Sequence, residues 1–202
     1  MPLLERLTCR FRMKGPKLLT LLLFIKEEGP VGRYRASQAL GVSEGVMRGL
    51  LKRMAEDGIV QVMRAGVMLT PKGQRVIDEL LSEVGILDVK EVDLRPLSPG
   101  KLNVVAHIKR CGDKVTNGMR ERDTAVRHGA EGAIIMVVKR NRLEVPSVYD
   151  DLKNVYPDLA NRLFSLFKLN DRDVLVATFD NDRWLLIEAT IAVAIELKET
   201  SS

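Results

Sequence analysis

Between residues 17 and 85, every helical or strand-like stretch of the sequence ends at its own cap or turn signal. Ser43 is a strong helix N-cap residue, Gly58 suits the left-handed position that follows a helix, and Pro71 suits a first helical turn. The dipeptide Ala65-Gly66 separates two apolar runs, which predicts a hairpin. The expected elements are helices over 17–28, 33–40, 43–57 and 71–84, and strands over 59–64 and 67–70.

Three helices, a hairpin and a further helix follow one another in the order of a winged helix-turn-helix, which we expect over residues 1–85. Residues 86–202 alternate strand-like and helical stretches, which is typical of a small layered α/β domain. The predicted fold class is therefore α+β. The elements expected in this second domain are strands over 89–94, 102–109, 133–139, 143–145 and 173–179, and helices over 115–128, 150–169 (interrupted at Pro157) and 184–198.

The helix expected over 43–57 places two glycines on the face away from its apolar residues. Each interior glycine costs about 1 kcal/mol relative to alanine. We interpret Gly45 and Gly49 as positions at which the helix backbone comes close to DNA. The alternative is that they pack against a neighbouring helix while Arg48 is bridged to Glu44. The apolar residues of the opposite, core-facing side are Met47, Leu50, Leu51 and Met54.

The net charge of +5 is concentrated in the N-terminal part, where 14 Lys and Arg residues face 9 Asp and Glu residues. A basic module beside a neutral one predicts a polyanion partner for the first, although a solvated basic surface would have the same composition. We expect Arg48 to read a guanine edge, and Lys52 and Arg53 to contact phosphates. The candidate DNA-binding residues are Arg33, Arg35, Ser43, Glu44, Gly45, Arg48, Gly49, Lys52, Arg53 and, at the hairpin tip, Arg64.

In the second domain the strand at 102–109, the helix at 115–128 and the strand at 133–139 predict a right-handed βαβ unit. Ligands of such sheets collect beyond the carboxyl ends of the strands, and a helix N-terminus there can hold an anion. An ordinary loop, in which the same residues serve turns, is the alternative. The candidate effector-binding residues are Arg110, Asp113, Lys114, Asn117, Arg120 and Asp180.

Several classes of function lack their sequence signals. Cys9 and Cys111 form no CxxC pair, and the i,i+4 spacing of His107 and Cys111 would need further ligands such as Asp113 to hold a metal. We find no P-loop, no Ser/His/Asp set and no carboxylate pair at a useful spacing, so we expect neither an enzyme nor a bound cofactor or metal. The sequence has no secretory signal and no membrane-spanning stretch, which predicts a cytoplasmic protein without a membrane partner.

The run "VGRYRASQALGVSEGVMRGLLKRMAEDGIVQVMRAGVMLTPKG" resembles the winged-helix regulators of prokaryotes, with "LTPKG" after the wing. The start "LLERLTCRFRMKGP" and the later segments "NGMRERDTAVRHGAEGA" and "DRDVLVATFDNDRWLLIEATIAVAIEL" resemble an archaeal family that joins a winged helix to a C-terminal domain of uncharacterised function. The resemblance covers nearly the whole chain. It implies the N-terminal fold and DNA binding, and it implies no ligand for the C-terminal domain.

The expected function is that of a sequence-specific transcriptional regulator that binds double-stranded DNA as a homodimer. Its C-terminal domain would sense a small-molecule effector or mediate dimerisation, with the helix at 71–84 as the coupling element. One alternative is an enzyme acting on a nucleotide or phosphorylated small molecule and carrying a winged helix for self-regulation. Another is a winged helix that serves as a protein-interaction module.

Overall fold

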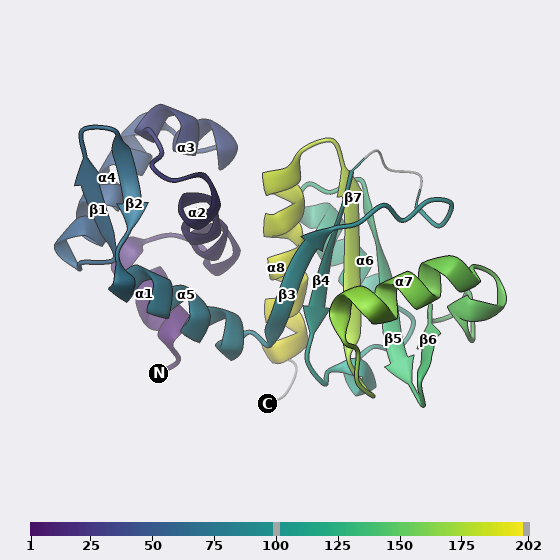
Figure 1. Ribbon diagram of the computed structural model, residues 1–202. Coiled ribbons are helices and arrows are strands. Elements are labelled where there is room, and N and C mark those ends of the chain that lie inside the picture. Colours follow the sequence, from purple (N-terminus) through teal and green to yellow (C-terminus); the bar gives the residue numbers. More distant parts are fainter. Residues whose placement is uncertain (99–101, 200–202) are drawn as a thin grey trace. The chain divides into compact units, whose positions relative to one another are not determined.

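The computed structural model describes residues 1–98 and 102–199, and the chain divides into two compact units between Glu83 and Val84 (Figure 1). The helices and the hairpin expected for the N-terminal unit are confirmed, with ends that differ by one or two residues. The elements of this unit are α1 (Leu3–Phe11), α2 (Gly15–Glu28), α3 (Arg33–Ala39), α4 (Glu44–Glu56), β1 (Val60–Met63), β2 (Gly66–Leu69) and α5 (Pro71–Glu83).

The core of the N-terminal unit is organised around α2. Each residue from Leu18 to Ile25 is buried, so this helix is enclosed on every side rather than along one stripe. It contacts α1, α3, α5 and β2. The apolar residues of α4 pack inward as the sequence predicted: Met47, Leu50, Leu51 and Met54 are each at most 2% exposed.

An N-terminal helix, α1, precedes the elements that the sequence predicted. It lacks a side-chain cap at its start and is held by partners distant in sequence. The Glu83 carboxylate accepts hydrogen bonds from the amides of Leu3 and Leu4, at 2.8 and 3.1 Å. Arg10 makes a two-pronged contact with Asp57, at 2.9 and 2.7 Å. Helix α1 is therefore fixed by α5 and by the end of α4.

The hairpin is fixed to the helices by a third extended segment. Val31 and Val67 exchange backbone hydrogen bonds of 3.0 and 2.8 Å, so the connection between α2 and α3 pairs with β2. Gly66 lies against this segment with a φ of +138°, and a Cβ atom there would lie 2.8 Å from the Val31 carbonyl oxygen. Only glycine permits this approach without moving the backbone.

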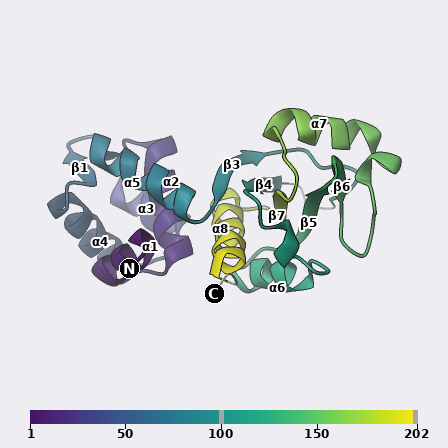
Figure 2. The ribbon, with the colours of Figure 1, turned by 90° about the horizontal axis from the view of Figure 1, so that it is seen from below.

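The C-terminal unit is a single sheet with helices on both faces. Helix α7 covers one face, and α6 and α8 cover the other (Figure 2). The strand order is β3-β4-β7-β5-β6, and each neighbouring pair is antiparallel. The elements are β3 (Ile86–Glu91), β4 (Leu102–Ile108), α6 (Met119–Arg127), β5 (Gly132–Lys139), β6 (Arg142–Glu144), α7 (Pro157–Phe167), β7 (Val174–Asp180) and α8 (Arg183–Glu199), with short 3-10 turns at Gly112–Lys114 and Leu152–Asn154.

Three expectations for this unit differ from the structure in part. The strands β4 and β5 run parallel in one sheet and are joined through α6, as expected for a βαβ unit, but they are not neighbours, because β7 lies between them and runs antiparallel to both. The helix expected from residue 115 begins only at Met119, since Gly118 adopts a left-handed conformation with φ of 77°. The first strand also lies three residues earlier than expected, at 86–91.

A buried polar pair joins β4 to the start of β7. The His107 Nε2 atom lies 2.7 Å from Asp173 Oδ2, and the two side chains are 3% and 1% exposed. Asp173 also accepts hydrogen bonds from the amides of Arg110 and Asn170, at 3.0 and 2.9 Å. Burial alone would raise the pKa of Asp173, but the hydrogen bonds outweigh that effect and hold its pKa below the usual range.

We expect Gly66→Ala to lower the free energy of unfolding by about 1–3 kcal/mol, since the new methyl group meets the Val31 backbone at a positive φ. Gly45→Ala is the matched control, because its methyl group meets no atom within 4 Å. That change should stabilise the protein by about 0.5–1 kcal/mol. Calorimetry of the full chain measures both, and equal unfolding temperatures for the two variants would contradict the account.

We expect Asp173→Asn to lower the free energy of unfolding by about 1–3 kcal/mol at pH 7. The pKa of Asp173 is lower in the folded chain than the unfolded value of about 3.9, so its contribution is present above that value and is lost as the pH falls through the folded pKa. Denaturant titrations at pH 7 and pH 3 should therefore show a smaller acid-induced loss for the variant. The exposed Asp123→Asn control should change neither the stability at pH 7 nor its loss at pH 3. Identical pH profiles of stability for Asp173→Asn and wild type would disprove the stabilising role of the Asp173 carboxylate.

Candidate nucleic-acid interface

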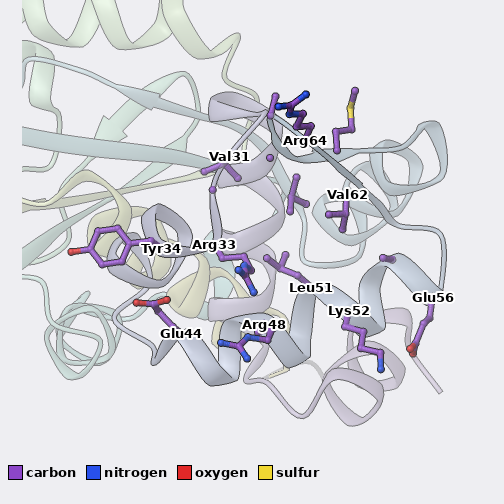
Figure 3. Close-up of a pocket in the computed structure, with 16 residues that line it drawn as sticks. Val31, Arg33, Tyr34, Glu44, Arg48, Leu51, Lys52, Glu56, Val62 and Arg64 are labelled. Carbon is purple, nitrogen blue, oxygen red and sulfur yellow. The ribbon is translucent and has the colours of Figure 1, made fainter.

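An open groove of about 830 Å³ runs between the helices α3 and α4 and the hairpin (Figure 3). Helix α4 forms its floor, starting from Ser43, whose Oγ atom accepts a hydrogen bond of 3.4 Å from the amide of Val46. The N-cap predicted from the sequence is thus confirmed. The candidate residues that line the groove are Arg33 from α3, Glu44, Arg48 and Lys52 from α4, and Arg64 from the hairpin tip.

The cations of the groove have no ion-pair partner in the part of the chain that the structure describes. Among the residues that the structure describes, Arg33, Arg48, Lys52 and Arg64 make no ion pair or side-chain hydrogen bond, and all four are exposed. Glu44 lies one helical turn before Arg48, and no ion pair between them is found in the described chain. Four unpaired positive charges that converge on one groove form a surface suited to phosphate groups.

Two candidate residues serve the fold instead. Arg53 donates a hydrogen bond of 2.9 Å to the carbonyl oxygen of Phe11 and so ties α4 to α1; it does not line the groove. Arg35 pairs with Glu28 at 2.5 Å and also lies outside the lining. The guanidinium group of Arg53 is directed toward the N-terminal helix, and the expectation that it contacts phosphates stays a prediction.

The two glycines of α4 lie in open space. A Cβ atom at Gly45 would meet no atom within 4 Å, and one at Gly49 would meet only the Arg53 guanidinium, at 3.6 Å. Neither glycine packs against another helix, so the packing alternative is wrong. Their shared face is a strip of bare backbone beside the row formed by Glu44, Arg48 and Lys52.

Sequence reasoning missed several groove residues. Tyr34 is 64% exposed on α3, and Val62 and Met63 are 62% and 47% exposed on the hairpin. Their exposure was not readable from residue type, since an aromatic or branched residue in such a segment is usually assigned to the core. Strand alternation offered no signal either, because adjacent side chains should lie on opposite faces and only the first of the four residues of β1 is buried. The groove therefore combines a basic floor with a partly apolar wall.

The candidate effector residues do not form one cluster. Arg110 follows the C-terminal end of β4. Asp180 is the last residue of β7 and pairs with the first residue of β4, so it lies at the opposite end of these strands. The ammonium group of Lys114 donates to the carbonyl oxygen of Leu197, at the end of α8. The remaining three are also engaged locally: Asp113 pairs with Arg172, Asn117 accepts from the amide of Met119, and Arg120 pairs with Glu196 at 2.8 Å.

The described residues contain no group of three or more His, Cys, Asp and Glu side chains placed to hold a metal ion. His107 is bound to Asp173, and Cys111 is buried, which raises the pKa of its thiol to about 12. No helix in the described ranges is long and apolar enough to cross a membrane.

Two family models match successive parts of the chain. Residues 17–84 match the CggR N-terminal DNA binding domain. The N-terminal unit carries a DNA-binding domain of the regulator type. Residues 99–197 match a domain of unknown function (DUF4443). The matched N-terminal residues include every element that lines the groove, so the groove belongs to the part of the chain for which the match indicates DNA binding.

The chain is also similar to a curated regulator and to a solved structure. Over 100 residues the chain is 33% identical to the Central glycolytic genes regulator of Bacillus subtilis (strain 168), a match that covers 48% of this chain and 28% of that protein. The chain therefore spans less than a third of the length of this curated relative. Among solved structures, a hypothetical protein from Pyrococcus horikoshii OT3 is 26% identical, with a TM-score of 0.69 and coverage of 92% of each chain.

We expect Gly45→Ala and Gly49→Ala to weaken binding to duplex DNA about ten-fold each, because added methyl groups would hold the α4 backbone away from base edges. Fluorescence anisotropy with a bound duplex measures this change. Thermal unfolding is the control, since both variants should be at least as stable as wild type, so that weaker binding does not arise from unfolding. Unchanged affinity for both variants would refute the close-approach interpretation.

Proposed function

We propose that the chain is a sequence-specific, DNA-binding transcriptional regulator whose α4 enters the major groove. The observation that carries the proposal is the groove, whose four cations have no partner among residues 1–98 and 102–199. It lies inside the part of the chain that matches a DNA-binding domain. A major groove about 12 Å wide admits one α-helix. The N-terminal residues of α4 then face base edges, as in other helix-turn-helix proteins.

The roles of individual residues follow from their places around α4. Arg48, in the first half of the helix and without a carboxylate partner, is assigned to a guanine, whose O6 and N7 atoms accept a two-pronged contact. Lys52 lies one turn further along, Arg33 lies on α3 and Arg64 lies at the hairpin tip. These three line the groove outside the first turn of α4 and are assigned to phosphates.

The C-terminal unit is proposed to sense a small molecule or to mediate dimerisation. A homodimer would bind two half-sites, and contact energies from both half-sites would add. Helix α5 ends at the boundary between the two units, which makes it the proposed coupling element. An effector would act by favouring one relative placement of two copies of α4. Membership of an archaeal family, suggested by the sequence resemblance, stays a prediction.

The enzyme alternative has less support from the structure. A nucleotide or phosphate site was expected around Lys114 and Arg120, but the first contacts the end of α8 and the second pairs with Glu196. A thermal-shift screen of nucleotides, phosphorylated metabolites and metals separates the two readings. Saturable stabilisation without turnover would support a sensor, and a reaction product would support an enzyme.

We expect Arg48→Ala and Lys52→Ala to affect DNA binding in different ways. Arg48→Ala should cost about 1–3 kcal/mol on the preferred duplex and relax selectivity at one base position. Lys52→Ala should weaken binding to all duplexes alike and reduce the slope of log affinity against log salt by about 1. The measurement is affinity for specific and random duplexes across a salt series. Equal losses on both duplexes for Arg48→Ala would exclude base reading by this residue.

A further inference from the structure

Glu44 is an acidic residue in a groove whose other charged residues are mostly basic. It is the first residue of α4 and lines the groove together with Arg33, Arg48 and Lys52 (Figure 3). Its side chain is exposed, and within the described chain it makes no ion pair or hydrogen bond. The carboxylate is therefore available to a ligand that enters the groove.

A free carboxylate at a phosphate-binding surface weakens binding, because it repels the DNA backbone. It becomes favourable when it accepts a hydrogen bond from a base. In the major groove the exposed donors are the amino groups of cytosine N4 and adenine N6, and carboxylates pair with cytosine whereas carboxamides pair with adenine. A position at the N-terminal end of a recognition helix is where such a contact is made.

We propose that Glu44 is a specificity-determining residue that accepts a hydrogen bond from the N4 amino group of a cytosine. This inference rests on the proposed function and adds a second base contact to that of Arg48. The two residues are four positions apart on one helix, a rise of about 6 Å. Successive base pairs are about 3.4 Å apart. Each half-site therefore contains a cytosine within about two steps of the guanine read by Arg48.

Gly45 makes this contact sterically accessible. It follows Glu44 directly and has no side chain, and a Cβ atom there would meet no atom of the described chain within 4 Å. A second groove-lining carboxylate, Glu56, provides the comparison: it is also exposed but is the last residue of α4, at the end remote from the bases. It should read no base.

The test is selection of bound duplexes from a randomised library by the full chain, with wild type, Glu44→Gln, Glu44→Ala and Glu56→Gln. Wild type should select cytosine at one position of each half-site. Glu44→Gln should change that preference to adenine, because a carboxamide pairs with adenine N6 and N7. Glu44→Ala should lose about ten-fold discrimination at that position alone. Glu56→Gln should leave the selected motif unchanged.

The outcomes separate this inference from the function on which it rests. If Glu44→Ala binds all duplexes more tightly and the motif is unchanged, Glu44 reads no base and the inference is wrong, while the regulator proposal stands. If wild type selects no motif, the proposed function itself fails. Thermal unfolding of each variant shows whether it is folded, and Glu44→Gln, which keeps the shape of the side chain, supplies the decisive result if Glu44→Ala does not fold.

Discussion

The backbone pairing of Val31 with Val67 makes the groove possible. The hairpin of β1 and β2 has only two strands of its own, and two strands alone are marginally stable. The pairing adds a third extended segment and holds one wall of the groove beside α4. It depends in turn on Gly66, since a side chain there would displace the Val31 backbone. The position of Arg64 relative to Arg48 therefore depends on a glycine that contacts neither.

The basic character of the N-terminal unit has two separate physical roles. Some of its cations hold the fold together: Arg10 with Asp57, Arg53 with the Phe11 carbonyl group, and Lys17 with the Leu40 carbonyl group. Others, in the groove, have no protein partner among the described residues. Net charge does not distinguish these groups. The presence or absence of a protein partner does distinguish them, and it leaves a small set of basic residues around α4 as candidates for DNA contact.

Sequence reasoning predicted those features that local chemistry determines. The start of α4 at Ser43 and the start of α5 after Thr70 were readable because a capping side chain bonds an amide three residues away. Helix α1 was not, since its stabilising partner Glu83 lies about 80 residues away. For the same reason the hydrogen bond of Arg53 could not be predicted, since its acceptor is 42 residues distant. The strand order could not be predicted from local sequence either, because β7, which follows β5 and β6 in the chain, lies between β4 and β5 in the sheet.

The most direct test of the account is hydrogen–deuterium exchange of the full chain with and without a bound duplex. The account predicts slower exchange in the α3 segment at Arg33 and Tyr34, in the first half of α4, and around the hairpin tip, because these surround the groove. Helix α1, which is tied to Arg53 and contributes no residue to the groove lining, should change little. Protection confined to α1 or to the C-terminal unit, with none along α4, would contradict the assignment of this groove to DNA.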